Sequence, residues 1–217
     1  VLVAENLIAP HHQHFFNIRL DFDVDGTANG VKEYNVSTDR RSRSNPHGNG
    51  FSVTQTVLAR ERRAVRDMNP ASHRMWVVYN PNTASSLGHP SGYLIEPGMM
   101  VTPFLAKSSP VRKKAGYLDH HLFVTRYRED ERYAAGDYPG GHADRGNVLS
   151  WTRDNENLFN EDVVTWFTLG VTHVARPEDF PVMSSAHANL RIVPKGFFPR
   201  NPALRVPDSG ASPGDPP

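Results

Sequence analysis

Two histidines one residue apart, His12 and His14, are the first candidates for chemistry in this chain. Side chains alternate between the two faces of a β-strand, so these imidazoles share one face if residues 13–24 form a single strand. Two imidazoles on one face can bind one metal ion from the same side, and imidazole suits copper, zinc, iron or nickel. That face continues through alternate apolar residues to Val24, so we expect it to be a buried stripe.

The opposite face of the same strand carries two carboxylates, Asp21 and Asp23. Carboxylates at this spacing, with a backbone carbonyl between them, suit a hard cation such as calcium. Taken alone, the histidine pair could be a surface feature and the aspartate pair a solvated face or turn. Because both pairs lie on one strand with opposite polarity, the sequence favours two metal sites.

A third histidine should complete the imidazole site, and His173 is the best candidate because it closes the apolar segment 163–174. His120 and His121, which precede another strand-like segment at 122–127, have the best rival claim. Charged residues that follow the third histidine can form pairs that orient it: Arg176, Glu178 and Asp179.

A three-histidine site on a β-sandwich also fits other chemistry, such as a zinc hydrolase or a mononuclear copper or iron oxygenase. A hydrolase needs a general base within reach of the metal-bound water. Glu178 is the nearest candidate by sequence, but it is more simply interpreted as the ion-pair partner of Arg176. We therefore keep this interpretation as a minor alternative.

Short segments between prolines must position these residues, since 18 prolines and 16 glycines are spread along the chain. Such punctuation favours strands and turns over long helices. One short helix is expected at about 60–68, ending before Asn69-Pro70. Segments rich in β-branched and aromatic residues predict strands at 15–24, 51–58, 75–79, 92–96, 122–127, 163–174 and 190–193. The predicted fold is all-β, mainly antiparallel, and a β-sandwich.

Composition excludes several classes of protein. The 217 residues include no cysteine, which rules out disulfides, thiolate zinc sites, iron–sulfur clusters and a cysteine nucleophile. A net charge of +1 argues against nucleic acid as a partner, and no apolar run is long enough for a membrane span. We interpret the basic runs at 37–50 and 112–114 as solvated, and 208–217 as a disordered tail. A soluble cytoplasmic or secreted protein fits equally well.

Four stretches of sequence, in order along the chain, carry a family resemblance. They are HQHFFNIRLDFDVDG at 12–26, LFVTRY at 122–127, THVARPEDFPVM at 172–183, and GFF followed by NPAL at 196–204. Together they resemble the C-terminal part of the catalytic domain of copper-containing, topaquinone-dependent primary amine oxidases. The resemblance covers residues 1–207 and implies a β super-sandwich that is incomplete at its N-terminal side. It also implies a homodimer with hairpin arms, in which the loop 79–92 could take part.

The resemblance assigns roles to individual residues. It implies copper(II) bound by His12, His14 and His173, with Met183 close to the copper. A peripheral calcium or manganese ion would be bound by Asp21, Phe22, Asp23, Asp162 and Val163, with Phe22 and Val163 contributing backbone carbonyls. A second peripheral cation would be bound by Glu61, Trp151, Asp154 and Glu156, with Trp151 contributing its carbonyl.

The family's reaction is oxidative deamination, in which a primary amine, O2 and water become an aldehyde, ammonia and hydrogen peroxide. It requires copper, a topaquinone made from a tyrosine that follows an asparagine, and an aspartate that acts as general base. None of the seven tyrosines here follows an asparagine, and Tyr34 has its asparagine on the wrong side. The start at Val1 is therefore expected to be a cut ahead of the copper strand. We expect this chain alone to be inactive.

Three interpretations remain open at this point. The chain could be the C-terminal part of an ordinary amine oxidase, or one subunit of a split oxidase whose partner chain carries the tyrosine and the base. It could also be a metal-binding β module without oxidase activity. The first two imply a primary amine, O2, the N-terminal remainder or a partner chain, and a second copy as partners. The sequence does not identify the amine.

Overall fold

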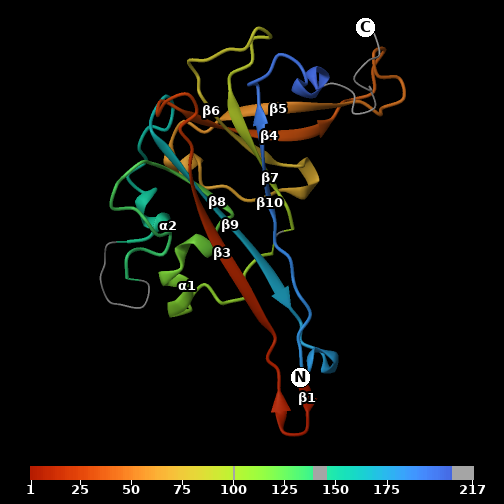
Figure 1. Cartoon of the computed structure of the whole chain (residues 1–217), viewed down its shortest axis with the longest axis vertical. Coiled ribbons are helices and arrows are strands. Elements are labelled where there is room, and N and C mark those ends of the chain that lie inside the picture. Colours follow the sequence, from red (N-terminus) through yellow and green to blue (C-terminus); the bar gives the residue numbers. More distant parts are fainter. Residues whose placement is uncertain (100, 139–145, 207–217) are drawn as a thin grey trace, which may run out of the picture.

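Ten strands and a few short helices form the regular structure of the computed structural model, which describes residues 1–99, 101–138 and 146–206 (Figure 1). The strands are β1 (Leu2–Ala4), β2 (Leu7–Ile8), β3 (His12–Asp21), β4 (Gly30–Thr38), β5 (Phe51–Val57), β6 (Met75–Tyr79), β7 (Gly92–Pro97), β8 (Leu122–Arg126), β9 (Val163–His173) and β10 (Leu190–Lys195). The helices are α1 (Pro110–Lys114) and α2 (Val148–Trp151), with 3-10 turns η1 (Glu61–Arg63), η2 (Pro70–Ser72), η3 (Gly116–Leu118), η4 (Pro177–Asp179) and η5 (Pro202–Arg205). The predicted disordered tail at 208–217 lies outside the described residues.

The strands form two larger sheets and one hairpin, and every pairing between them is antiparallel. One sheet has the order β10-β7-β6-β4-β5 and the other has the order β3-β9-β8. The β1–β2 hairpin lies at the narrow end of the molecule, next to the beginning of β3 (Figure 1). The predicted all-β, mainly antiparallel class is confirmed.

Side chains from the two sheets meet in a shared core, which makes the arrangement a sandwich. Trp76 on β6 packs edge-on against Phe167 on β9, with ring centroids 6.1 Å apart and both side chains fully buried. Burying one such aromatic side chain stabilises the fold by roughly 1.5–3 kcal/mol. The buried residues of this core are Val24, Val31, Leu58, Ala64, Trp76, Val78, Ile95, Leu122, Val124, Leu158, Val163, Phe167 and Leu169.

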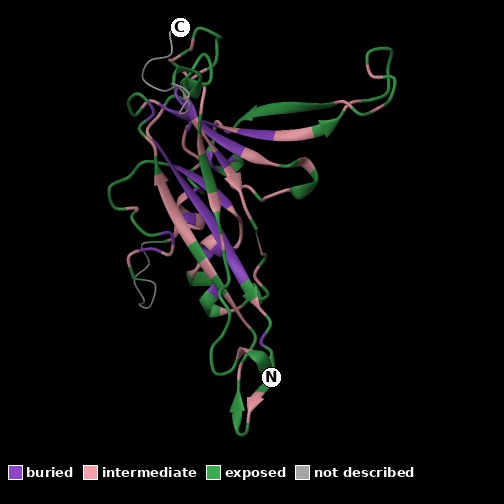
Figure 2. Cartoon of the chain, turned by 45° about the vertical axis from the view of Figure 1, so that its right-hand side comes forward, coloured by how far each residue is buried: buried purple, intermediate pink, exposed green. Residues whose placement is uncertain are grey.

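The outer face of the three-stranded sheet is covered as well. Phe123 on β8 and Trp166 on β9 form a second buried cluster with Val148 of α2. Strand β9 is therefore buried on both faces over nine consecutive residues, which are coloured purple in Figure 2. A strand covered on both sides reads as a continuous apolar run rather than an alternating one, as this segment does. His173 therefore lies at the end of a strand that is held rigidly by packing on both faces.

The apolar stripe predicted on β3 is wrong at its histidine end. Phe16 is 53% exposed, and the strand ends at Asp21 rather than at residue 24. Ile18 and Leu20 pack against the core, because the five-stranded sheet covers only that half of β3. The half that carries the histidines has no such cover among the described residues.

The helix predicted at 60–68 is also wrong. Only the η1 turn forms there, and Arg66 then exchanges backbone hydrogen bonds with Leu122, with N···O distances of 2.8 and 2.9 Å. A backbone engaged in a bridge to β8 cannot make the i to i−4 bonds of a helix. The expectation of a solvated run at 112–114 fails at Arg112, which is 9% exposed and donates to Asp119 at 2.7 Å.

The β4–β5 hairpin projects from the body of the molecule, and its second strand is exposed along its whole length (Figure 2). The loop 80–91 is instead closed on itself. Ser85 N donates to His89 O at 2.7 Å, and Asn80 N donates to Ser91 O at 2.9 Å. The hairpin thus projects from the sheet, whereas the loop packs on itself; whether the loop 79–92 takes part in a dimer arm stays a prediction.

Candidate metal centre

The pairing of β3 with β9 places the predicted histidines side by side. His12 lies directly opposite His173 in the antiparallel register, so both side chains share one face. The ring centroids of His12 and His173 are 5.1 Å apart, and those of His12 and His14 are 4.9 Å apart. The structure thus brings together the three imidazoles that the sequence singled out.

Hydrogen bonds select the ring nitrogen that each histidine can offer to a metal. His12 Nδ1 lies 3.0 Å from Pro10 O, and because a carbonyl only accepts, Nδ1 carries the proton and Nε2 is free. His173 Nε2 lies 2.8 Å from Asp179 Oδ2, so Nε2–H donates and Nδ1 keeps its lone pair. A carboxylate behind a metal-binding histidine is the usual arrangement that fixes tautomer and orientation.

Asp179 is held in place by the backbone. Its Oδ2 also accepts from Arg176 N at 2.9 Å, and the side chain is 5% exposed. The bond from Arg176 N and the adjacent His173 imidazole hold the pKa of Asp179 below its usual value. The carboxylate therefore stays charged and can stabilise an imidazole that binds a cation.

The imidazole set fits a borderline metal by its chemistry. All three donors are neutral nitrogens, and two have orienting partners that leave a lone pair available. Their nitrogen atoms do not gather within 4.8 Å of one another as the acidic clusters described below do. A shared ion would require at least one ring to turn about its side-chain torsions, which have several staggered minima.

Two other residues predicted to lie near this centre, Met183 and Glu178, are exposed. Met183 is 46% exposed, and no hydrogen bond within the described ranges joins it to the three histidines. Glu178 is exposed, and Arg176 pairs with Asp179 at 3.5 Å instead, which corrects the predicted Arg176–Glu178 pair.

The rival histidines are engaged elsewhere. His120 Nδ1 and His121 Nδ1 lie 2.9 and 3.0 Å from the two oxygens of Asp67. His11, which follows Pro10, accepts from Ala175 N through Nδ1 at 3.0 Å. These contacts tie loops to the ends of β8 and β9.

Strands β3 and β9 approach each other closely at Gly170. A Cβ added there would lie 2.6 Å from His14 O and 2.8 Å from the ring of Phe15. Distances of that kind essentially never occur for real Cβ atoms, so only glycine fits. The missing side chain lets β3 lie against β9 next to His14.

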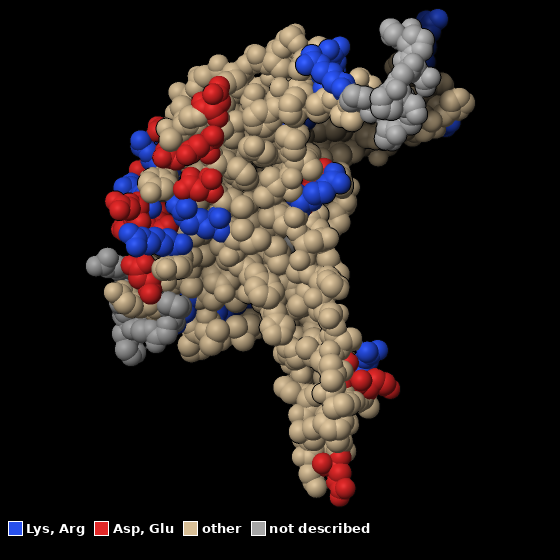
Figure 3. All heavy atoms as spheres, viewed as in Figure 1, with Lys and Arg blue, Asp and Glu red and all other residues tan. Residues whose placement is uncertain are grey.

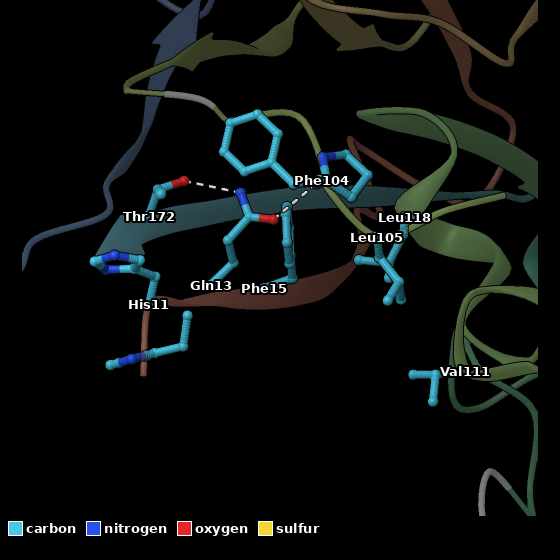
Figure 4. A pocket seen from close by; sticks show the side chains of 10 residues that line it. His11, Gln13, Phe15, Phe104, Leu105, Val111, Leu118 and Thr172 are labelled. Atoms are coloured by element: carbon cyan, nitrogen blue, oxygen red, sulfur yellow. Dashed lines mark hydrogen bonds between the residues drawn. The ribbon is translucent and has the colours of Figure 1, made fainter. Parts of the chain in front are cut away.

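A cleft of about 500 Å³ opens beside the histidines, on the opposite face of β3 (Figure 4). The Gln13 amide lies at its centre, donating to Thr172 Oγ1 at 2.8 Å and accepting from Phe104 N at 2.8 Å. Its walls are mainly apolar, and Phe104 is 79% exposed. The residues lining it are His11, His12, Gln13, Phe15, Pro103, Phe104, Leu105, Val111, Leu118 and Thr172. No sequence pattern indicates this cleft, because residues 103–118 show neither the alternation of a strand nor the periodicity of a helix.

The three carboxylates predicted for the first peripheral site lie together at the far end of β3. Carboxylate oxygens of Asp21, Asp23 and Asp162 lie within 4.8 Å of one another. Burial and the negative charges of Asp21 and Asp23 raise the pKa of Asp162. Arg19 offsets part of this repulsion by donating to Asp21 at 3.0 Å.

The backbone contributors proposed for that site adjoin it in sequence. Val163 begins β9 and is buried, and the ring of Phe22 stacks on Tyr93 with centroids 5.3 Å apart. Both residues are therefore fixed by packing.

The three carboxylates predicted for the second peripheral site also lie together, since Glu61, Asp154 and Glu156 place oxygens within 4.8 Å of one another. Glu61 is 2% exposed and accepts from Arg126 N at 3.1 Å and Glu156 N at 2.9 Å. Burial, together with Asp154, raises the pKa of Glu61 to about 7. Arg128 donates to Glu156 at 2.7 Å.

The surroundings of this second cluster are acidic too. Burial raises the pKa of nearby Glu131 to about 7. Trp151 ends α2, and its ring packs against Trp166 with centroids 5.6 Å apart. In the space-filling view, Asp and Glu side chains gather along the edge of the molecule where α2 lies, interleaved with Lys and Arg (Figure 3). The narrow end, which carries β1, shows few charges in the same view.

Comparison with known proteins identifies relatives over almost the whole chain. Residues 1–212 match the family model described as "Copper amine oxidase, enzyme domain". The chain is 41% identical over 209 residues to a histamine oxidase from Arthrobacter globiformis, and 37% identical over 214 residues to a copper-containing diamine oxidase from Nicotiana tabacum. These alignments cover 96% of this chain but 31% and 27% of the relatives.

Solved structures give the same result. A copper-containing benzylamine oxidase from Hansenula polymorpha superposes with a TM-score of 0.84 at 33% identity. That match covers 93% of this chain and 32% of the other, so the chain spans about a third of the length of the relatives it matches. Within the described residues, no helix is long and apolar enough to cross a membrane.

Proposed function

The chain belongs to the copper amine oxidase family, and on that premise we propose that it forms the copper-binding part of a primary amine oxidase. The observation that carries this proposal is the adjacency of His12, His14 and His173 across the β3–β9 pair. When bound, copper and topaquinone would supply the redox chemistry that turns a primary amine, O2 and water into an aldehyde, ammonia and hydrogen peroxide.

This chain's own contribution is to hold and orient the copper ligands. His12 would bind through Nε2 and His173 through Nδ1, because Pro10 O and Asp179 engage their other nitrogens. Asp179 would favour the charge that His173 acquires when it binds a cation. The position of Met183 near the copper remains part of this proposal.

We propose that the two acidic clusters bind calcium or manganese. Three carboxylates within 4.8 Å repel one another, and a divalent cation would remove that repulsion. The raised pKa values of Asp162 and Glu61 support this assignment. The carbonyls of Phe22 and Val163 would complete the first site and that of Trp151 the second.

The quinone-forming tyrosine and the catalytic aspartate would come from sequence outside this chain. The cleft around Gln13, with exposed Phe104 beside it, offers an apolar surface on which that part of an oxidase could pack. We propose that the oxidase is a homodimer and that the β4–β5 hairpin is one of its arms.

Copper loading tests the histidine assignment directly. Protein loaded with Cu(II) and freed of excess metal should retain one copper per chain, with nitrogen hyperfine structure in its EPR spectrum. His173→Ala should lose most of the copper, whereas His187→Ala, an exposed histidine, should keep it. Equal retention by His173→Ala and the parent would defeat the three-histidine assignment.

A complementation assay tests the oxidase assignment. Mixing the copper-loaded chain with a protein that supplies the tyrosine and aspartate should produce quinone colour and amine-dependent peroxide. Copper binding without colour or peroxide in that mixture would support the metal-binding module instead.

A further inference from the structure

A pocket on the outer face of the five-stranded sheet, remote in sequence from the histidines, is lined by cations and aromatic rings. It lies over β4, β6 and β10, which Figure 1 labels, and has a volume of about 130 Å³. Its lining residues are Lys32, Tyr34, Gln55, Val77, Tyr79, His89, Pro90 and Lys195. None of them belongs to the sites described above.

The sheet register explains why this pocket is hollow. Gly30, Tyr79, Gly92 and Lys195 form one cross-strand row on β4, β6, β7 and β10. A Cβ at Gly92 would clash with Val78 O, and one at Gly30 would lie 3.4 Å from the Tyr79 ring. Two positions of the row therefore carry no side chain, which leaves space above Tyr79.

Two lysines point their charges into this space. Lys32 Nζ lies 4.1 Å from the centroid of the Tyr79 ring, and Lys195 Nζ lies 5.3 Å from that of Tyr34. Both tyrosines are buried, so the rings form a fixed floor that holds the ammonium groups by cation–π attraction. The pocket is thus preorganised around two positive charges.

Neither ammonium group has a carboxylate within 4.0 Å among the described residues, in which the ion pairs that form are made by arginines and histidines. Glu33, the acidic neighbour of Lys32, faces the opposite side of the sheet, where Arg66 binds it. Burial, followed by the charge of Lys195, lowers the pKa of Lys32. Two like charges therefore lie close together, with no carboxylate of the described residues between them.

We propose that this pocket binds a phosphate group, either as inorganic phosphate or as the end of a small phosphomonoester. A dianion matches the two lysine charges, and the phenol groups of Tyr34 and Tyr79 line the same pocket and can donate hydrogen bonds. A volume of about 130 Å³ is enough for one such oxyanion.

Calorimetric titration of the whole protein with inorganic phosphate tests the proposal. One saturable site is expected, with an affinity that falls as ionic strength rises. Lys32→Met and Lys195→Met should each weaken binding at least about tenfold, because each removes one of two charge-assisted contacts. Lys107→Met, at an exposed lysine outside the pocket, should change it less than about twofold.

Additional variants and a second ligand complete the titration experiment. Lys32→Arg retains the charge and should restore most of the binding lost in Lys32→Met. If the Lys32 variants misfold, substitution of Lys195, which lies on the edge strand β10, tests the same pocket. Tighter binding of glycerol phosphate than of inorganic phosphate would identify a phosphomonoester. Heats no larger than those of chloride at equal ionic strength, or equal weakening by Lys107→Met, would overturn the proposal.

Discussion

Replacing Asp179 should weaken copper binding without removing any copper ligand. The carboxylate accepts the Nε2 proton of His173 at 2.8 Å and the backbone proton of Arg176 at 2.9 Å, and it is 5% exposed. It therefore fixes the imidazole so that Nδ1 faces the metal, and it compensates for positive charge on the ring. An alanine variant lacks both the orienting hydrogen bond and the negative charge. An asparagine variant lacks only the negative charge.

The expected loss of copper affinity differs between the two variants for this reason. Loss of a partner behind a metal-binding histidine typically costs 10–100-fold in affinity, which is about 1.4–2.8 kcal/mol. Asp179→Asn keeps an oxygen that can accept both protons, so it should fall near tenfold. Asp179→Ala loses the acceptor as well, so it should approach a hundredfold.

Competition against a copper chelator of known affinity measures this loss, and the EPR spectrum reports whether His173 still binds. Glu178→Gln is the matched control, since Glu178 is the exposed acidic neighbour and makes no side-chain bond within the described ranges. If Asp179→Ala binds copper within about threefold of the parent while its melting temperature is unchanged, the orienting role of Asp179 is refuted.

Three further predictions concern the strands and cation sites. Asp162→Asn should abolish the calcium-dependent rise in melting temperature, expected to be about 5–10 °C at 100-fold excess over Kd; a rise equal to the parent's would exclude Asp162 as a ligand. Gly170→Ala should cost about 1–3 kcal/mol in urea unfolding and weaken copper binding, because the added methyl on β9 would push His14 O, and β3 with it, away; unchanged values would contradict the close approach. Since the pKa of Glu61 rises from 4.5 to about 7 on folding, the folded metal-free protein retains a proton that the unfolded chain releases. Its unfolding free energy should therefore fall as pH rises between those values, and added calcium should flatten the slope in denaturant titrations.

The sequence located most strands because their alternation or apolar runs are strong, but it missed β4 and the short strands β1 and β2. Strand β4 places Glu33 on its inner face, where an apolar residue would be expected, and the side chain is 2% exposed. Arg66 donates to it at 2.6 and 2.7 Å, and Trp76 Nε1 donates at 3.2 Å. Although burial opposes ionisation, the hydrogen bonds from Arg66 and Asn35 hold the pKa of Glu33 below its usual value. A buried charge satisfied by distant residues breaks the pattern that identifies a strand.

The histidine site was predictable to the level of residues but not of atoms. Period-two alternation places His12 and His14 on one face, and an apolar run ending at His173 indicates a buried neighbouring strand. Their direct opposition depends on the register between β3 and β9, which are separated by about 140 residues and which no local pattern specifies. The choice of ring nitrogen depends on Pro10 O and Asp179, and is therefore visible only in the folded structure.

The copper and calcium candidates lie at opposite ends of the same β3–β9 ladder. Nine residue steps separate His12 from Asp21, which at roughly 3.3 Å per residue is about 30 Å. That separation is several times the Debye length at physiological ionic strength, so a cation at the aspartates cannot change the copper site through its charge. It can act through the ladder, because fixing Asp21 against Asp162 pins the register that sets His12 opposite His173. Calcium at this position would therefore govern the stability of the copper site, while the electronic properties of the copper would depend on Asp179 and the imidazoles.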